Sequence, residues 1–196
     1  MKNKFLRKVT VTAILAAMST ALMFMSFPVP LMPKFIKLDF SELPALIAAY
    51  ALGPIYGVCV SIVKNLINGI FFSLTGGVGE LSNCILSSTF VFTAGMIYKK
   101  KKRRSYALLG AVVGSFIMAG MSLISNYYLV YPRYQKFVPL EAIMGLYQAI
   151  YPGVKNLWQA LIVFNVPFTF IKGMLNTLIA FVIYKKISPI IKGKDI

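Results

Sequence analysis

Three ionisable side chains interrupt otherwise apolar stretches of this chain: Lys64, Glu80 and Lys172. An ionisable group inside an apolar segment is costly, so it usually marks a binding site or a pathway. Lys172 is the most informative, because Thr169 and Asn176 share its face if the segment is helical. The alternatives are a Lys172 ammonium that reaches the membrane surface and a Glu80 carboxylate favoured at a helix N-terminus.

A further amide lies at a comparable depth, since Asn126 occurs near the end of an apolar segment and is followed by Tyr127 and Tyr128. An amide both donates and accepts hydrogen bonds, and tyrosine rings cover flat apolar surfaces. These groups predict a pocket for a small planar polar molecule. A flavin fits, because its ring edge alternates carbonyl acceptors with an N–H donor; nucleobases, pterins and other vitamins fit nearly as well.

The elements that must position these groups are transmembrane helices. The 196 residues are 58% hydrophobic and 13% charged, with a mean hydropathy of +0.75. Because a crossing helix needs about 20 apolar residues, we predict a single all-α integral membrane domain, 1–196, with six transmembrane helices. The six apolar segments are 9–27, 43–52, 54–72, 78–98, 106–129 and 157–184. The second ends at Gly53-Pro54 and is expected to be short, tilted or partly re-entrant.

The charge pattern orients these helices. The chain has 21 Lys and Arg against 5 Asp and Glu, a net charge of +16. Most cations form three clusters: Lys2, Lys4, Arg7 and Lys8; the loop 99–104; and Lys185, Lys186, Lys192 and Lys194. Short basic loops stay cytoplasmic, so six crossings place both termini in the cytoplasm. Such charge serves orientation and contact with the lipid bilayer, and no nucleic-acid partner is expected.

Two long connections face the opposite side. The connection 28–38 contains Pro28, Pro30 and Pro33, and 130–156 contains three further prolines and several tyrosines. Proline-rich loops are stiff and lose little entropy on binding. We expect them to act as extracellular gates or lids over an outward-facing site; the alternative is that they are plain connectors.

The sequence lacks the residues that enzymes and metal-binding proteins need. The chain has no histidine and no paired carboxylates at helical spacing, and Cys59 and Cys84 lie in apolar segments. Neither catalytic residues nor a metal site is therefore expected, and we predict that the protein is not an enzyme. A self-sufficient small-molecule carrier is an alternative, although no convincing internal repeat supports it.

Longer motifs carry a family resemblance. Residues 27–44 (FPVPLMPKFIKLDFSELP), 48–57 (AAYALGPIYG) and the pair Lys64-Asn65 resemble the riboflavin-specific substrate-binding subunits (S components) of energy-coupling factor transporters. The resemblance implies a bacterial plasma-membrane subunit that binds riboflavin from outside with high affinity. It would deliver riboflavin inward together with a transmembrane coupling subunit and two ATPases. Flavin mononucleotide, flavin analogues and other vitamins are further candidate ligands.

The resemblance also implies that ATP is used by the partners. The chain contains no Gly-x-x-x-x-Gly-Lys-Ser/Thr phosphate loop, and no cofactor of its own is expected. Small residues on the first helix of similar proteins face the coupling subunit, which here corresponds to Ala13, Ala17 and Ala21. Packing of these alanines against a neighbouring helix of the same chain is the alternative.

Site residues follow from the same resemblance. Relatives have Phe-Asn-x-x-Lys-Gly in the last helix, where this chain has Thr169 in place of the amide, followed by Lys172. Asn126 matches the asparagine of the fifth helix. The full set of expected substrate-binding residues is Asn126, Tyr127, Thr169, Lys172 and Asn176, with Asp39 and, for the ribityl hydroxyls, Glu80 and Asn83. Because the hydroxyl of Thr169 reaches less far than an amide, the ring edge is expected to be held through water or by Asn165 or Asn176 instead, and Lys64-Asn65 is expected to pair within the bundle. The gate is expected to comprise Pro28, Pro30, Pro33 and Phe40.

Overall fold

The computed structural model describes residues 2–33, 35–73 and 76–192. Two predicted loop or tail cations, Lys34 and Lys194, lie outside the described residues, as do the side chains of Lys2, Lys185, Lys186 and Lys192. The described part is almost entirely helical. Its helices are α1 (Lys2–Phe24), α2 (Glu42–Ala51), α3 (Pro54–Phe71), α4 (Val78–Lys100), α5 (Arg104–Ser125), α6 (Tyr131–Tyr134), α7 (Leu140–Gln148), α8 (Leu157–Ala160) and α9 (Val166–Lys192).

Two long helices are continuous through π-helical turns. The turn η1 (Asn126–Val130) joins α5 to α6, and η2 (Leu161–Asn165) joins α8 to α9. In each case a proline, Pro132 or Pro167, follows two residues after the turn. A proline lacks an N–H and clashes with the carbonyl four residues back, and a π-turn absorbs that misfit without breaking the helix. The chain therefore bends near Pro167 instead of starting a new helix there.

Within the described residues, five helical stretches are long and apolar enough to cross a membrane: Lys4–Phe24, Pro54–Phe71, Val78–Lys100, Arg104–Tyr134 and Leu157–Tyr184. The second predicted segment, 43–52, is short, as expected, and does not span the membrane by its helix alone. Helix α2 has 10 residues, which span about 15 Å of a hydrocarbon layer of about 30 Å.

Helix α2 is instead enclosed by protein. Nine of its 10 residues are buried, and it contacts α1, α3, α4 and α9. Its polar ends therefore meet protein groups in place of lipid, which is the condition under which a short membrane helix is tolerated. The predicted break at Gly53-Pro54 is confirmed: Gly53 has a φ of +127°, which other residues rarely adopt, and Pro54 opens α3.

Small residues set the close spacing of the long helices. A Cβ at Gly110 of α5 would lie 2.7 Å from the Ala94 carbonyl oxygen of α4. A Cβ at Gly173 of α9 would lie 2.5 Å from Ser115 Oγ of α5. Such contacts let backbones approach closely, which is how helices associate in lipid. They fix α9, and with it Lys172, against the rest of the bundle.

Both predicted outer loops contain secondary structure. In the first, β1 (Phe27–Pro28) pairs antiparallel with β2 (Lys37–Leu38), so the expected all-α fold includes a two-stranded hairpin. The prediction that 130–156 is a loop is wrong over α6 and α7. Helix α7 forms because Ile143 and Tyr147, four residues apart, bury one face against the bundle.

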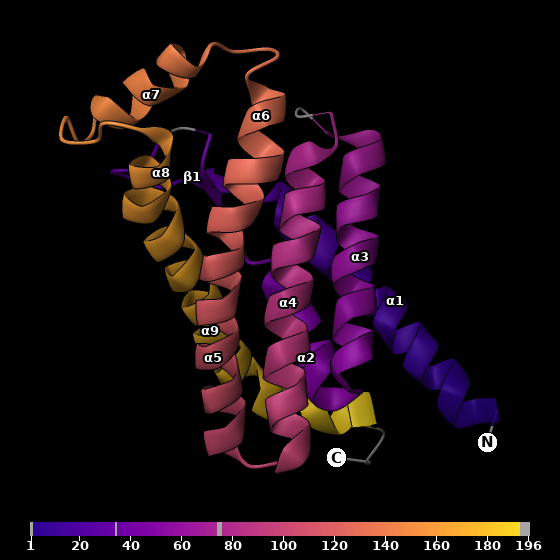
Figure 1. The fold of residues 1–196 in the computed structure, drawn as a ribbon. Helices are drawn as coiled ribbons and strands as arrows, with labels where there is room; N and C mark the ends of the chain where they lie inside the picture. Colours follow the sequence, from indigo (N-terminus) through magenta and orange to yellow (C-terminus); the bar gives the residue numbers. More distant parts are fainter. Residues whose placement is uncertain (1, 34, 74–75, 193–196) are drawn as a thin grey trace.

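The arrangement separates two ends of the bundle (Figure 1). The hairpin, α6 and α7 gather at one end. The N-terminal end of α1, the α4–α5 connection and the C-terminal end of α9 lie at the other end. The predicted gates and the predicted basic clusters therefore occupy opposite ends.

Candidate substrate-binding site

Four buried charges form an ion cluster inside the bundle: Asp39, Glu42, Lys64 and Lys172. Lys64 Nζ lies 2.9 Å from Glu42 Oε1, and Lys172 Nζ lies 2.8 Å from Asp39 Oδ2 and 3.8 Å from Glu42 Oε1. The cluster holds two cations and two anions, so its net charge is zero. Buried charges persist when they are paired in this way and further hydrogen-bonded.

Serine hydroxyls complete the ion cluster. Lys64 donates to Ser41 Oγ at 2.6 Å, Ser41 donates to Asp39 Oδ1 at 2.5 Å, and Ser87 of α4 donates to Glu42 Oε2. The Asp39 carboxylate accepts from Lys172 of α9 and from Ser41, and Ser41 also accepts from Lys64 of α3. Asp39 therefore ties the start of α2 to α3 and α9.

One face of α9 carries polar groups from the ion cluster toward the hairpin end. Asn176 donates from Nδ2 to the Lys172 carbonyl at 2.9 Å and to the Asp39 carbonyl at 3.3 Å, and its buried Oδ1 has no hydrogen-bond partner among the described residues. Thr169 is also buried. Asn165 lies seven residues before Lys172, about 10 Å along the helix.

Asn165 lines a cavity of about 310 Å³, which we call the amide pocket. Its lining residues are Phe35, Ile36, Asn126, Val130, Tyr131, Tyr134, Val138, Ile143, Leu146 and Asn165. Both amides belong to the π-turns: Asn126 opens η1 and Asn165 closes η2. Asn126 donates one N–H to the Ser122 carbonyl at 2.7 Å, and Asn165 accepts from Tyr147 at 2.9 Å. The Asn126 carbonyl and the Asn165 amino group can therefore serve a ligand.

Aromatic side chains cover the amide pocket at the hairpin end of the bundle. The Tyr147 hydroxyl of α7 contacts the Tyr131 hydroxyl at 2.5 Å and donates to Asn165. The Phe35 ring of the hairpin packs edge-on against the Tyr147 ring, with centroids 5.7 Å apart. The two predicted gates thus meet directly above the pocket. Of the predicted gate residues, Phe40 packs with Phe27 at the base of the hairpin.

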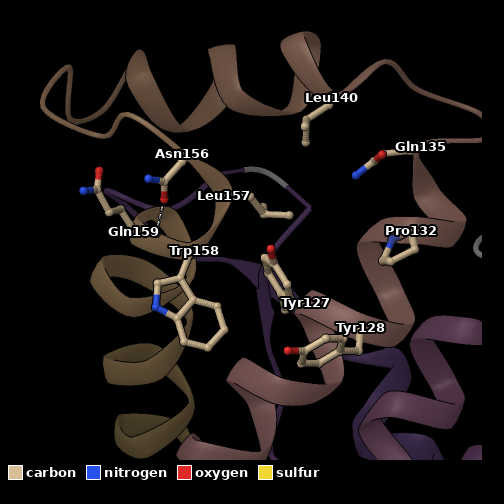
Figure 2. A pocket seen from close by; sticks show the side chains of 9 residues that line it. All are labelled: Tyr127, Tyr128, Pro132, Gln135, Leu140, Asn156, Leu157, Trp158 and Gln159. Carbon is tan, nitrogen blue, oxygen red and sulfur yellow. Dashed lines mark hydrogen bonds between the residues drawn. The ribbon is translucent and has the colours of Figure 1, made fainter.

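Tyr127 lies outside the amide pocket. It lines a separate open cleft of about 700 Å³, the aromatic cleft, with Tyr128, Gln135 and Trp158 among the lining residues. Figure 2 shows these side chains around the hollow beneath α7. Tyr127 and Trp158 pack with their rings perpendicular and their centroids 5.1 Å apart. The structure therefore does not bring Tyr127 together with Asn126 on one wall.

Glu80 and Asn83 lie on α4, before Ser87 of the ion cluster in the chain. Glu80 accepts from Ser73 at 2.8 Å and is close enough to Tyr134 of the amide pocket to interact electrostatically. Asn83 donates to Asn65 at 3.0 Å. Lys64 and Asn65 thus pair within the bundle, as their positions predicted.

The predicted partner face of α1 points outward. Ala13, Ala17 and Ala21 are exposed, whereas Ala16 of the same helix is buried against the bundle. The alternative that these three alanines pack within the chain is wrong. Figure 1 shows the N-terminal end of α1 leaning away from the other helices.

The sequence left several site residues unassigned: Glu42 of the ion cluster and Phe35, Tyr131, Tyr134 and Tyr147 of the amide pocket. The signal for Glu42 was present, because two lysines in apolar segments need two buried anions and the chain has five acidic residues. The tyrosines gave no such signal, since their positions depend on α7 folding back.

A buried ion cluster beside an amide-lined cavity, within membrane-type helices and under a hairpin, defines a membrane protein that binds a small solute. Comparison with protein families gives the class. The model of "ECF transporter, substrate-specific component" matches residues 7–184, so the chain belongs to this family of energy-coupling factor (ECF) S components. Members recognise a transported substrate, and the chain is a transporter subunit and not an enzyme.

Individual relatives are similar over nearly their full length. The chain is 29% identical to the riboflavin transporter RibU of Staphylococcus aureus (strain TCH60), covering 95% of this chain and 93% of that protein. It is 29% identical to the riboflavin transporter FmnP of Bacillus subtilis (strain 168), covering 93% of each. It also resembles a solved S component of a bacterial ECF transporter, with a TM-score of 0.73, 28% identity and coverage of 98% and 99%.

Proposed function

We propose that this protein is the riboflavin-binding S component of an ECF transporter. The observation that carries the proposal is the amide pocket, where Asn126 and Asn165 offer both a hydrogen-bond donor and an acceptor between aromatic walls. That combination matches the edge and face of a flavin ring. The similarity to two riboflavin transporters supports the same ligand.

The ring edge is held by Asn126 and Asn165, with Thr169 and Lys172 further along the same face of α9. Thr169 is shorter than an amide, and Asn165, one turn away, supplies the missing amide group. Lys172 has three N–H donors, and Asp39 and Glu42 do not use all of them. Glu80, near Tyr134, and Asn83 serve the ribityl hydroxyls. Asn176 and Asp39 hold Lys172 in place.

The hairpin 28–38 and the segment 130–156 act as the gate. The Phe35–Tyr147 contact closes the pocket at the hairpin end of the bundle, and hydrogen bonds from Tyr147 to Tyr131 and Asn165 help to hold α7 there. Release of that contact opens the pocket to the outside.

The hairpin end faces the cell exterior, and the basic end faces the cytoplasm of a bacterial cell. A short second pass formed by α2 and the strand before it, added to the five long helical stretches, would return both termini to the cytoplasmic side of the plasma membrane (N-in/C-in). The exposed face of Ala13, Ala17 and Ala21 docks on the transmembrane coupling subunit, whose two ATPases hydrolyse ATP.

Binding by purified protein tests the ligand. Asn126→Ala should weaken riboflavin binding by about 10-fold, the value of one lost hydrogen bond in a buried site. Gln135→Ala is the matched control, because it truncates an amide that lines the aromatic cleft and not the amide pocket. Equal effects of the two variants would contradict the pocket assignment.

Uptake tests the need for partners. In riboflavin-auxotrophic cells without their own transporter, this chain should support uptake only when the coupling subunit and ATPases are co-expressed. Uptake by the chain alone would favour the alternative of a self-sufficient carrier. Binding of another vitamin in place of riboflavin would favour an S component of different specificity.

A further inference from the structure

A cavity of about 260 Å³ lies at the end of the bundle opposite the amide pocket. We call it the basic pocket. It occupies the junction where α2 ends, α3 begins and α4 ends. Its polar lining includes Tyr56, Tyr98, Lys99 and Lys102. Riboflavin binding, as proposed above, makes no use of it.

The charge around the basic pocket is one-sided. Lys99 and Lys102 are exposed at its rim, and Lys8 Nζ lies 5.5 Å from the centroid of the Tyr56 ring. The carboxylates of the described residues lie elsewhere: Asp39 and Glu42 are in the ion cluster, and Glu80 and Glu141 are near the hairpin end. No carboxylate of the described part forms a salt bridge with Lys99 or Lys102. The rim of the basic pocket is therefore positively charged, with no neutralising carboxylate among the described residues.

The walls of the basic pocket are apolar and rigid. Gly95 packs so closely that an added Cβ would lie 2.9 Å from Pro54 Cβ and 3.2 Å from Ala49 Cβ. The Tyr50 and Tyr98 rings also line the pocket, with centroids 4.9 Å apart and their planes tilted by 58°. An apolar floor beneath a cationic rim suits an anion that carries apolar groups, because a small hydrated anion would leave the floor wet.

We propose that the basic pocket binds the phosphate group of an anionic phospholipid from the cytoplasmic leaflet. The lysines neutralise the phosphodiester, and the glycerol and first methylene groups cover the apolar walls. The choice of leaflet rests on the proposed orientation of the transporter subunit. The bound lipid would stabilise the contacts among α2, α3 and α4 at this end of the bundle. The same three helices contribute residues to the ion cluster. Free inorganic phosphate presents a similar anionic group to the lysines and is the alternative ligand.

The loop itself offers a matched pair of variants. Lys99→Gln/Lys102→Gln removes two charges that line the basic pocket, and Lys100→Gln/Lys101→Gln removes two charges that do not line it. Lys101 Nζ lies 5.5 Å from the centroid of the Tyr106 ring, which is not among the lining residues. Both variants have the same net charge, so general attraction to an anionic membrane is lowered equally.

Retention of lipid is measured by native mass spectrometry on protein exchanged into detergent from vesicles of phosphatidylcholine with about 30% phosphatidylglycerol. We expect the unmodified protein to retain one phosphatidylglycerol. Loss of the two lining lysines should weaken retention about 30-fold, at about a tenfold change per 1.4 kcal/mol and about 1 kcal/mol per lysine. The control should change retention less than about threefold.

Equal loss in both variants, or no preference for phosphatidylglycerol over phosphatidylcholine, would overturn the proposal. In pure phosphatidylcholine, stabilisation by inorganic phosphate that is lost only in Lys99→Gln/Lys102→Gln would confirm a phosphate site filled from solution. Riboflavin binding is measured on the same samples and is expected to be unchanged in both variants. A sample that keeps the lipid but never binds riboflavin would contradict the proposed function alone.

Discussion

The variant Lys172→Met tests two roles of the Lys172 ammonium group, namely stabilisation of the buried ion cluster and contact with riboflavin. Lys172 Nζ lies 2.8 Å from Asp39 and 3.8 Å from Glu42, and all three side chains are buried. Removing the cation leaves the ion cluster with a net charge of −1. Loss of one partner from a buried pair costs about 3–5 kcal/mol of the free energy of unfolding. Lys155→Met, which removes an exposed cation near the hairpin end, should cost less than about 0.5 kcal/mol.

The double variant Asp39→Asn/Lys172→Met restores neutrality. We expect it to regain all but about 1 kcal/mol of the lost stability, because the amide keeps its hydrogen bonds without an uncompensated charge. Riboflavin affinity should behave differently. If Lys172 donates to the flavin, both variants bind riboflavin about 10–100-fold more weakly, the value of a hydrogen bond to a charged group.

The assays are chemical unfolding in detergent micelles and calorimetric titration with riboflavin, on the same preparations. Failure of Asp39→Asn to recover the stability of Lys172→Met would refute the ion cluster as described. Recovery of both stability and riboflavin affinity in the double variant would refute direct contact between Lys172 and riboflavin, and Lys172 would then be a positioning residue.

Two further outcomes are expected. Ala17→Leu on the exposed face of α1 should abolish partner-dependent uptake while riboflavin binding is retained, whereas Ala16→Leu on the buried face should lower thermal stability. Gly110→Val should cost about 1–3 kcal/mol of unfolding free energy, because its Cβ would lie 2.7 Å from the Ala94 carbonyl oxygen.

The long helices could be predicted from the sequence because each apolar run is bounded by basic residues, glycine or proline. The break between α2 and α3 followed from Gly53-Pro54 in the same way. The status of α2 as a short buried helix depends on contacts with α1, α3, α4 and α9. Hydropathy cannot distinguish a segment that faces lipid from one that faces protein, so the sequence predicted a short second segment without showing that protein encloses it.

The site was only partly predictable for a related reason. Thr169, Lys172 and Asn176 were found together because α-helical spacing holds after Val166. Asn165 was named only as a substitute, because its direction depends on the π-turn before Pro167. Tyr127 lines the aromatic cleft and Asn126 lines the amide pocket, because neighbouring residues of η1 face different sides, and no sequence pattern indicated this separation. The residues 130–156 were predicted as a loop, so the tyrosines that cover the amide pocket were not identified.

Titration of the purified protein with riboflavin tests the central claim most directly. Trp158, the only tryptophan of the chain, contacts Tyr127 at the hairpin end and reports binding through its fluorescence. We expect saturable quenching at one riboflavin per protein, weakened in Asn126→Ala and unchanged in Gln135→Ala. Absence of saturable quenching, together with absence of calorimetric heat on adding riboflavin, would contradict the assignment of this S component to riboflavin.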